Sequence, residues 1–179
     1  ALASRIVDET RTSMVVGTWG NNQYIARKPV VDKDMFMTTV SSNPGWYILL
    51  DGSPTSAANL AWFLTHFTPY DLNDGAEKRA CLAEVNQMVA SVDPTESDIC
   101  FLPFLYDCNE KQKVDACWYG MKFHHTQRHM VRAIYEGIVF AHYTHFERLL
   151  EFRSRPDVIC CSGGATRSDV WMQMFADCF

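Results

Sequence analysis

The chain has 179 residues, and its 21 acidic and 16 basic side chains give a formal net charge of −5. This acidic balance argues against a nucleic-acid-binding surface, because such surfaces rely on an excess of cations that neutralise phosphates. Hydrophobic residues make up 47% of the chain, which is enough for one well-filled core. These values exclude a disordered or collagen-like protein and favour a single domain.

The seven cysteines include no C-x-x-C pair, which argues against a disulfide framework and against a thiolate zinc site. All apolar runs are far shorter than the roughly 20 residues that cross a bilayer, and no signal peptide opens the sequence. We therefore expect a cytoplasmic protein without membrane contact. The chain starts at Ala1 without a methionine and stops at Phe179 within an amphipathic pattern, so we expect it to be truncated at both ends.

Hydrophobic periodicity divides the chain into strands and helices. Short β-rich apolar runs predict strands, and apolar residues at i, i+3, i+4 and i+7 predict helices. The predicted elements in chain order are strands over 13–17, 23–26 and 46–50, a helix from Ser53 through Leu64, a helix over 76–91, strands over 99–102 and 116–121, a helix over 126–151, a strand over 158–161 and a last helix through Trp171 and Cys178.

This order predicts one α/β domain in which a mixed β-sheet is flanked by α-helices. Gly20-Asn21-Asn22 predicts a tight turn that makes the first two strands a hairpin. Ser53 and Pro54 predict the N-cap and the first position of the first helix. Gly137 provides a place for close packing in the longest helix.

Two glycine turns are candidate phosphate-binding sites. Gly163-Gly164 joins a buried strand to a helix start, where backbone N–H groups and the positive end of the helix can receive an anion. Gly17-Thr18 lies at the hairpin tip, where glycine permits close approach of a ligand and the threonine hydroxyl can bind a phosphate oxygen. Taken alone, each is more simply explained as a turn that needs glycine. Neither is a Walker A loop or a G-x-G-x-x-G dinucleotide motif.

Other candidate residues carry weaker signals. His125 and His129 lie one helical turn apart, a spacing that can hold a metal, but no third ligand is indicated and we expect no metal site. Asp32, Asp34 and Asp51 are candidate carboxylate bases, although solvated loop acids are the default interpretation of each. No cysteine has the sequence context of a nucleophile.

Taken together, these segments resemble the C-terminal domain of the FGGY family of carbohydrate kinases. Ala-Cys-Trp-Tyr-Gly-Met at 116–121, followed after seven residues by His-Met-Val-Arg-Ala-Ile-Tyr-Glu-Gly at 129–137, is similar to a signature of the family. Residues 162–177 resemble its adenosine segment, with Gly-Gly, Trp-x-Gln and Ala-Asp. Gly17-Thr18 matches its second phosphate loop, and residues 101–105 match its Phe-Leu-Pro stretch. The resemblance covers nearly the whole chain.

The resemblance implies a ribonuclease-H-like (actin-like ATPase) domain that takes part in the transfer of the γ-phosphate of MgATP to a sugar hydroxyl. It implies ATP and Mg²⁺ as cofactors, and ATP/ADP and a sugar as ligands. By this resemblance, Gly17 and Thr18 lie by the γ-phosphate. The α-phosphate and adenosine lie by Gly163, Gly164 and Ala165. The resemblance also implies that this second loop is supported by Gln173 and Asp177.

The resemblance also implies parts that the chain does not contain. The general base of the family is an aspartate that would lie upstream of Ala1, and Asp8 does not match it. The N-terminal sugar-binding domain is likewise implied to be absent. Residues 1–179 would therefore be the C-terminal nucleotide-binding domain, inactive by itself and paired with an N-terminal kinase domain in its parent.

Departures from the family pattern point to one branch. Residues 106–110 replace the Gly-Glu-Arg that often follows Phe-Leu-Pro, and Trp19 replaces a small residue after Gly-Thr. With residues 52–56 and Gly120-Met121, these departures resemble most the L-xylulose kinase branch, which implies a pentulose such as L-xylulose as the substrate. A non-catalytic nucleotide-binding or interaction module on the same fold is the alternative. A homodimer is possible, and the sequence fixes neither the sugar nor the oligomeric state.

Overall fold

The computed structural model describes residues 6–33, 37–96, 98–108 and 114–179. The helices, and the strands other than β3, lie close to the ranges that the periodicity predicted. The elements are β1 (Arg11–Val16), β2 (Gly20–Ala26), β3 (Met37–Val40), β4 (Tyr47–Ser53), α1 (Ala57–Phe67), α2 (Gly75–Ala90), β5 (Cys100–Leu102), β6 (Cys117–Tyr119), α3 (Gln127–Leu150), β7 (Val158–Ser162), a 3₁₀ turn η2 (Gly164–Arg167) and α4 (Asp169–Cys178).

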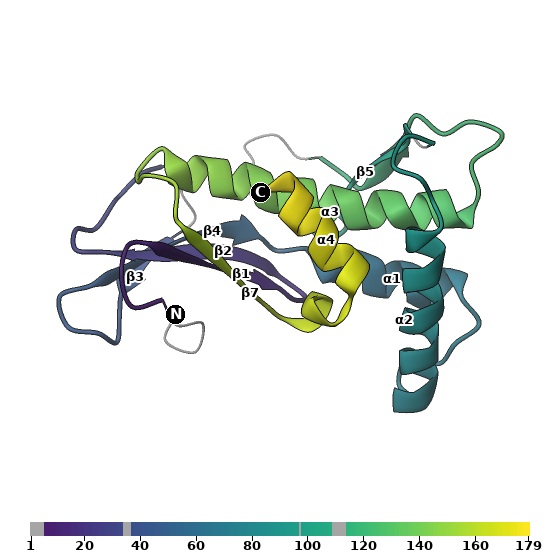
Figure 1. The fold of residues 1–179 in the computed structure, drawn as a ribbon, viewed down its shortest axis with the longest axis horizontal. Helices are drawn as coiled ribbons and strands as arrows, with labels where there is room; N and C mark the ends of the chain where they lie inside the picture. Colours follow the sequence, from purple (N-terminus) through teal and green to yellow (C-terminus); the bar gives the residue numbers. More distant parts are fainter. Residues whose placement is uncertain (1–5, 34–36, 97, 109–113) are drawn as a thin grey trace.

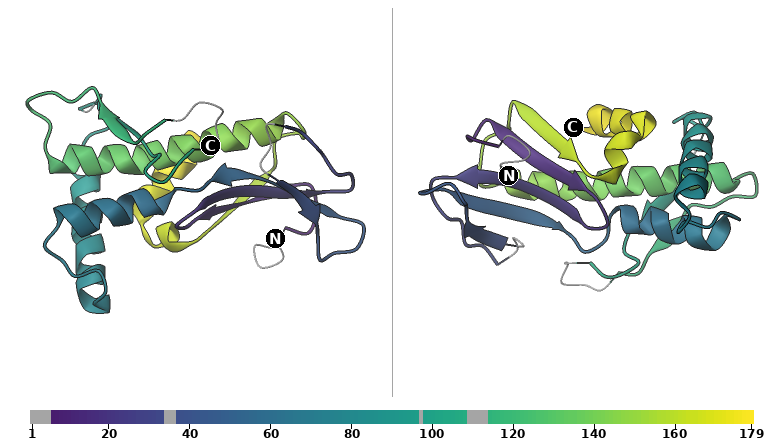
Figure 2. Two further views of the ribbon diagram at one scale, coloured as in Figure 1. Left: turned by 180° about the vertical axis from the view of Figure 1, so that it is seen from behind. Right: turned by 90° about the horizontal axis from the view of Figure 1, so that it is seen from below.

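The main sheet has five strands in the order β3-β4-β2-β1-β7. Its pairs are antiparallel except for β1 and β7, which run parallel. The longest helix, α3, lies along one face of the sheet, while α1 and α2 stand at the end remote from β3 (Figures 1 and 2). The prediction of a mixed sheet flanked by helices is confirmed. Among the described residues, no helix has both the length and the apolar character needed to span a membrane.

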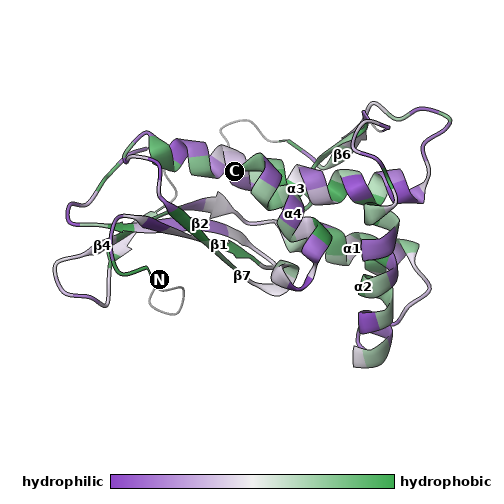
Figure 3. Ribbon diagram, viewed as in Figure 1, coloured by the Kyte–Doolittle hydropathy of each residue, from purple (hydrophilic) through white to green (hydrophobic). Residues whose placement is uncertain are grey.

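Helix α3 connects the sheet with the rest of the core. It has 24 residues, and at 1.5 Å per residue it is about 36 Å long. Hydrophobic and hydrophilic stretches alternate along it (Figure 3), and Ile134, Ile138 and Phe146 on its apolar side are fully buried. At its start, the Thr126 backbone N–H donates to His129 Nδ1 at 3.1 Å, which satisfies one of the amides left without a partner inside the helix.

Strands β5 and β6 form a separate two-stranded sheet that packs on α3. The rings of Phe101 and Trp118, which face each other across this pair, have their centroids 4.6 Å apart. Trp118 Nε1 donates to the carbonyl oxygen of Met130 in α3 at 3.1 Å. The aromatic side chains of the small sheet are thus fixed to the first turns of α3.

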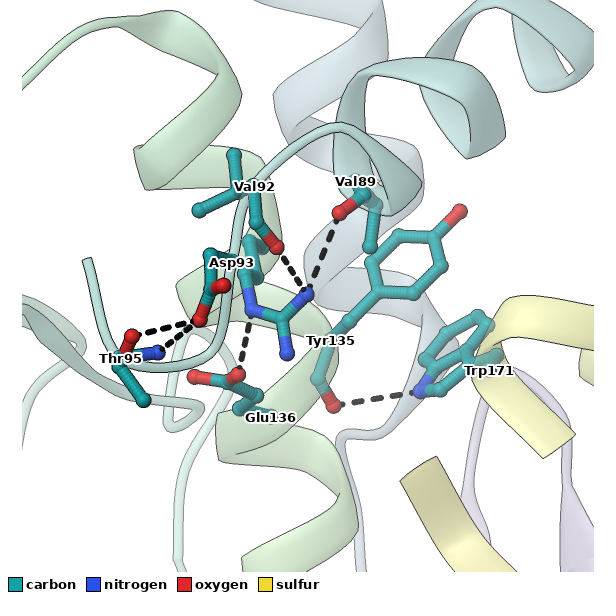
Figure 4. A network of polar contacts seen from close by, with 8 residues as sticks. Val89, Val92, Asp93, Thr95, Tyr135, Glu136 and Trp171 are labelled. Atoms are coloured by element: carbon teal, nitrogen blue, oxygen red, sulfur yellow. Dashed lines mark hydrogen bonds and ion pairs between the residues drawn. The ribbon is translucent and has the colours of Figure 1, made fainter. Parts of the chain in front are cut away.

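Side chains of α3 also hold α2 and α4 in place (Figure 4). Arg132 Nη1 donates to the carbonyl oxygens of Val89 and Val92 at 3.2 and 2.8 Å, where α2 ends. Val89 lies in the last turn of α2, whose carbonyls lack i+4 partners within the helix, and Val92 follows that turn, so the cationic side chain stabilises the C-terminal end of α2. Trp171 of α4 stacks on Tyr135, with ring centroids 4.2 Å apart, and donates through Nε1 to the Tyr135 carbonyl oxygen at 3.2 Å.

Three local predictions about the elements were wrong. The first hairpin turns at residues 17–19, whereas Gly20-Asn21-Asn22, which was predicted as the turn, begins β2 and pairs with β1. Helix α1 begins at Ala57 with Ser56 at its N-cap, whereas Ser53 is the last residue of β4 and its Oγ accepts from the Thr55 backbone N–H at 3.2 Å. A serine can satisfy amides in a turn as well as at a helix start, which makes the two hard to distinguish from sequence. Strand β3 was not predicted, because this half-exposed edge strand, Met-Thr-Thr-Val, lacks a clear alternation of apolar and polar residues.

Replacing Gly137 with alanine tests the close contact between α3 and β5. A Cβ on Gly137 would lie 2.3 Å from the carbonyl oxygen of Phe101, so the helix and strand must move apart. We expect Gly137→Ala to destabilise the fold by about 1–3 kcal/mol, as overpacking usually does, although alanine favours helices. Gly75→Ala in α2 is the matched control, because its Cβ would come no closer than 3.6 Å to Arg79. Urea unfolding measures both variants, and equal midpoints would contradict the contact.

Candidate functional site

The two glycine turns singled out in the sequence lie side by side. Because β1 and β7 are parallel, with Val15 opposite Ser162, the turns that follow them leave the sheet at the same edge. Gly163 has a φ of +105°, a conformation that favours glycine. A Cβ on it would lie 2.3 Å from the Val16 carbonyl oxygen and 3.2 Å from the Gly17 amide nitrogen. The backbones of the two turns are therefore in direct contact.

The second residue of the later turn faces open space. Apart from its two chain neighbours, no described residue has an atom within 4 Å of the position of a Cβ on Gly164. The next residue, Ala165, is buried and anchors η2 to the core. Ser168 then caps α4, since its Oγ accepts from the Trp171 backbone N–H at 3.3 Å. Accessible backbone directly before a helix start is an arrangement that suits an anion.

The first turn is held against the start of α1. The Ala57 backbone N–H donates to the Gly17 carbonyl oxygen at 2.8 Å, and the Ser56 N–H donates to the Thr18 carbonyl oxygen at 3.0 Å. Two amides at the start of the helix thereby fix two successive carbonyls of the loop. Thr18 is exposed, and so is Trp19, which shows 54% of its surface to solvent.

A buried polar cluster lies beneath this turn. His142 of α3 contacts Asn22 Oδ1 through Nδ1 and Ser56 Oγ through Nε2, both at 3.1 Å. The Asn22 amide nitrogen donates to the His142 carbonyl oxygen at 3.1 Å, so Asn22 Oδ1 is the acceptor for the ring. The proton therefore lies on Nδ1, and Nε2 accepts from the serine hydroxyl. Burial, aided by the nearby His145, lowers the pKa of His142 to about 3, which keeps the ring neutral.

The sequence did not identify this cluster. Its only local signals are the polar turn at 52–56 and the pair His142 and His145, spaced for one face of a helix. The contacts join residues that are 86 and 120 positions apart in the chain. A local sequence pattern cannot predict contacts between residues so far apart in the chain.

Among the candidate acids, Asp51 was interpreted as a solvated loop acid, and this interpretation was wrong. Asp51 is 1% exposed, lies in β4, and its Oδ2 pairs with His145 Nδ1 at 3.0 Å and Arg148 Nη1 at 3.2 Å. Burial of a carboxylate requires such partners, so Asp51 has a structural role. Asp32 is exposed, and Asp34 lies outside the described residues.

The remaining predicted residues, Gln173 and Asp177, belong to the helix that follows the later turn. Gln173 and Asp177 are on the exposed side of α4, and Gln173 Nε2 donates to Asp177 Oδ1 at 2.7 Å. This hydrogen bond joins the two side chains to each other, and their support of the loop stays a prediction. In the part of the chain that the structure describes, no three His, Cys, Asp or Glu side chains come together as metal ligands.

The buried His142 predicts a loss of stability in mild acid. In the unfolded chain this side chain has a pKa near 6.5, whereas in the folded protein it is about 3. Between these values the unfolded state binds the additional proton, so stability falls as the pH drops below 6.5, by about 2 kcal/mol at pH 5. The free energy of unfolding, measured with urea, should therefore fall less between pH 7 and pH 5 in His142→Gln than in the wild type. Burial also lowers the pKa of His129, but this residue is present in both proteins and contributes equally to both. An equal fall in the two proteins would contradict the assignment to His142.

Known proteins with similar sequences are sugar kinases. The chain is 36% identical to a probable L-xylulose kinase of Pasteurella multocida, with 99% of this chain and 35% of that protein covered. It is 37% identical to the L-xylulose/3-keto-L-gulonate kinase of Escherichia coli, with 99% and 34% covered. The chain thus spans about a third of the length of these relatives.

Solved structures show the same fold. The xylulose kinase of Rhodospirillum rubrum superposes with a TM-score of 0.84 at 22% identity, over 98% of this chain and 34% of that one. Plasmodium falciparum glycerol kinase with ADP superposes with a TM-score of 0.78 at 22% identity, over 98% and 35%. Residues 12–179 match the C-terminal domain of the FGGY family of carbohydrate kinases, and the chain belongs to this family.

Proposed function

We propose that residues 1–179 form the nucleotide-binding, C-terminal domain of an ATP-dependent sugar kinase. The observation that carries this proposal is the direct contact between the turn at Gly163 and the turn at Gly17, which the parallel pairing of β7 and β1 brings together at one end of the sheet. Membership of the FGGY family supplies the reaction class. A cytoplasmic location is part of the proposal, because the reaction consumes ATP.

In this proposal each turn takes one end of the triphosphate. Gly17 and Thr18 bind the γ-phosphate, where the exposed threonine can donate its hydroxyl to a phosphate oxygen. Gly163, Gly164 and Ala165 bind the α-phosphate and adenosine, where the open backbone at Gly164 allows close approach. The distance between neighbouring parallel strands, about 5 Å, is comparable with the separation of the α- and γ-phosphorus atoms, the two groups that the turns bind in this proposal.

The reaction follows from this arrangement. The sugar hydroxyl oxygen bonds to the γ-phosphorus, the bond from that phosphorus to the bridging oxygen breaks, and ADP leaves. The hydroxyl proton passes to a carboxylate base that we place outside residues 1–179. Residues of this chain bind and orient the phosphates, which is the main task of a protein in phosphoryl transfer. Mg²⁺, when bound, would neutralise charge on the phosphates, and it commonly takes most of its ligands from phosphates and water.

The substrate is proposed to be a pentulose such as L-xylulose. This rests on the relatives named as L-xylulose kinases at 36% and 37% identity. A panel of ketoses, polyols and sugar acids with coupled detection of ADP tests it in the full-length protein. L-Xylulose should give the highest kcat/KM. A sugar acid such as gluconate as the best substrate would contradict the proposal, and ADP release that no sugar stimulates would favour a non-catalytic module instead.

Replacing Gly164 with alanine separates nucleotide binding from folding. Because the described residues beyond the two chain neighbours leave the space within 4 Å of the added methyl group open, the fold should tolerate it. If the backbone contacts the nucleotide here, the methyl group obstructs the ligand, and we expect the Kd for ATP to rise about tenfold or more. Calorimetry and urea unfolding of the full-length protein measure both effects. A variant with normal stability and normal ATP affinity would remove Gly164 from the site.

Thr18 can be tested by removing only its hydroxyl group. Thr18→Val keeps the shape of the side chain but loses the donor, so kcat should fall on the order of tenfold to a hundredfold. The sugar KM should change less, because the hydroxyl serves the transferring phosphate. Thr18→Ser keeps a hydroxyl and is the control. Steady-state kinetics of the full-length kinase decides, and an unchanged kcat in the valine variant would place Thr18 outside the site.

A further inference from the structure

The buried cluster beneath the Gly17-Thr18 turn forms a continuous path from α3 to the loop. The imidazole of His142 accepts a hydrogen bond from the Ser56 hydroxyl at 3.1 Å. The backbone N–H of the same serine donates to the Thr18 carbonyl oxygen at 3.0 Å. Ser56 therefore connects the ring with the turn, through its hydroxyl on one side and its backbone N–H on the other.

The ring also limits the space beneath the hairpin. A Cβ on Gly20, the residue that follows the turn, would lie 3.0 Å from His142 Nε2 and 3.1 Å from Ser56 Cβ. The backbone of the hairpin thus rests directly on the imidazole. Asn22, which holds the other ring nitrogen, comes from β2, the second strand of the same hairpin. The ring is therefore fixed between β2 and the N-cap of α1.

The cluster is arranged for rigidity. His142 is 2% exposed, Asn22 is 0% exposed and Ser56 is 2% exposed, and each polar atom of the ring has a partner. Hydrogen bonds that are shielded from water and fully satisfied fix a single geometry. The neutral ring has one donor and one acceptor, and the cluster uses each once.

We propose that His142 is a positioning residue for phosphoryl transfer, which acts through Ser56 to hold the Gly17-Thr18 turn in its productive geometry. This inference rests on the proposed function of that turn. It predicts an effect on kcat, since a small displacement of a group that orients the transferring phosphate lowers the rate strongly. Sugar affinity should be nearly unaffected.

Two substitutions separate the contacts of the ring. In His142→Gln the amide oxygen can take the place of Nε2 and accept from Ser56, whereas in His142→Asn the amide group reaches only the place of Nδ1, next to Asn22. We expect the asparagine variant of the full-length kinase to lose about tenfold or more in kcat with a sugar KM within about twofold of the wild type. The glutamine variant should retain most of its kcat.

His145→Asn is the matched control. His145 is a buried histidine one turn further along α3, but its partner is Asp51 instead of Ser56. In His145→Asn the amide group can take the place of Nδ1 next to Asp51, so this variant removes a buried ring from the same helix and should leave kcat nearly unchanged. An equal loss of kcat in all three variants, or an unchanged kcat in His142→Asn, would overturn the inference.

Amide hydrogen exchange gives a readout that does not depend on activity. The Ser56 and Ala57 amides, which donate to the turn, should exchange faster in His142→Asn than in His142→Gln or His145→Asn. If the wild-type kinase phosphorylates no sugar, the proposed function fails, and the exchange rates alone then decide whether His142 holds the turn. Equal protection of these amides in all variants would refute it.

Discussion

The candidate site depends on the absence of a side chain at Gly163. Parallel pairing brings the ends of β1 and β7 to one end of the sheet. Only a residue without a Cβ can lie at position 163, because a Cβ there would overlap the Val16 carbonyl oxygen. The positive φ of this glycine then turns the chain into η2 and leaves Gly164 facing open space. A larger residue at position 163 would separate the two turns, and the surface they share would no longer exist.

The two turns are supported in different ways. The turn at Gly17 rests on buried hydrogen bonds of Ser56, Asn22 and His142, which fix its position. The turn at Gly164 is exposed, and its geometry comes from the covalent path into η2 and from the packing of Ala165. A group that must be oriented during a reaction benefits from the first kind of support. A backbone that must admit a ligand closely benefits from the second.

Sequence patterns predicted the parts of this arrangement but not how they meet. The periodicity of α3 and the glycines of both turns are local signals, so these features were predicted correctly. The surroundings of Asp51 and His142 depend on partners more than 80 residues away, and a local pattern cannot contain them. The stretch 129–137, which carries much of the family resemblance, proves to be mainly packing: Arg132 caps α2 and Gly137 contacts β5. A motif can thus identify a family without containing its reactive groups.

Helix α3 provides a common reference for both turns. The Tyr135 carbonyl oxygen accepts from Trp171, which follows the turn at Gly163, and His142 reaches the support of the turn at Gly17. These two residues lie seven positions apart on one helix, which corresponds to about 10 Å along its axis. Because one helix contacts the support of both loops, the regular geometry of that helix fixes the position of one loop relative to the other. A change in the relative position of the two turns would therefore break contacts of α3 on both sides.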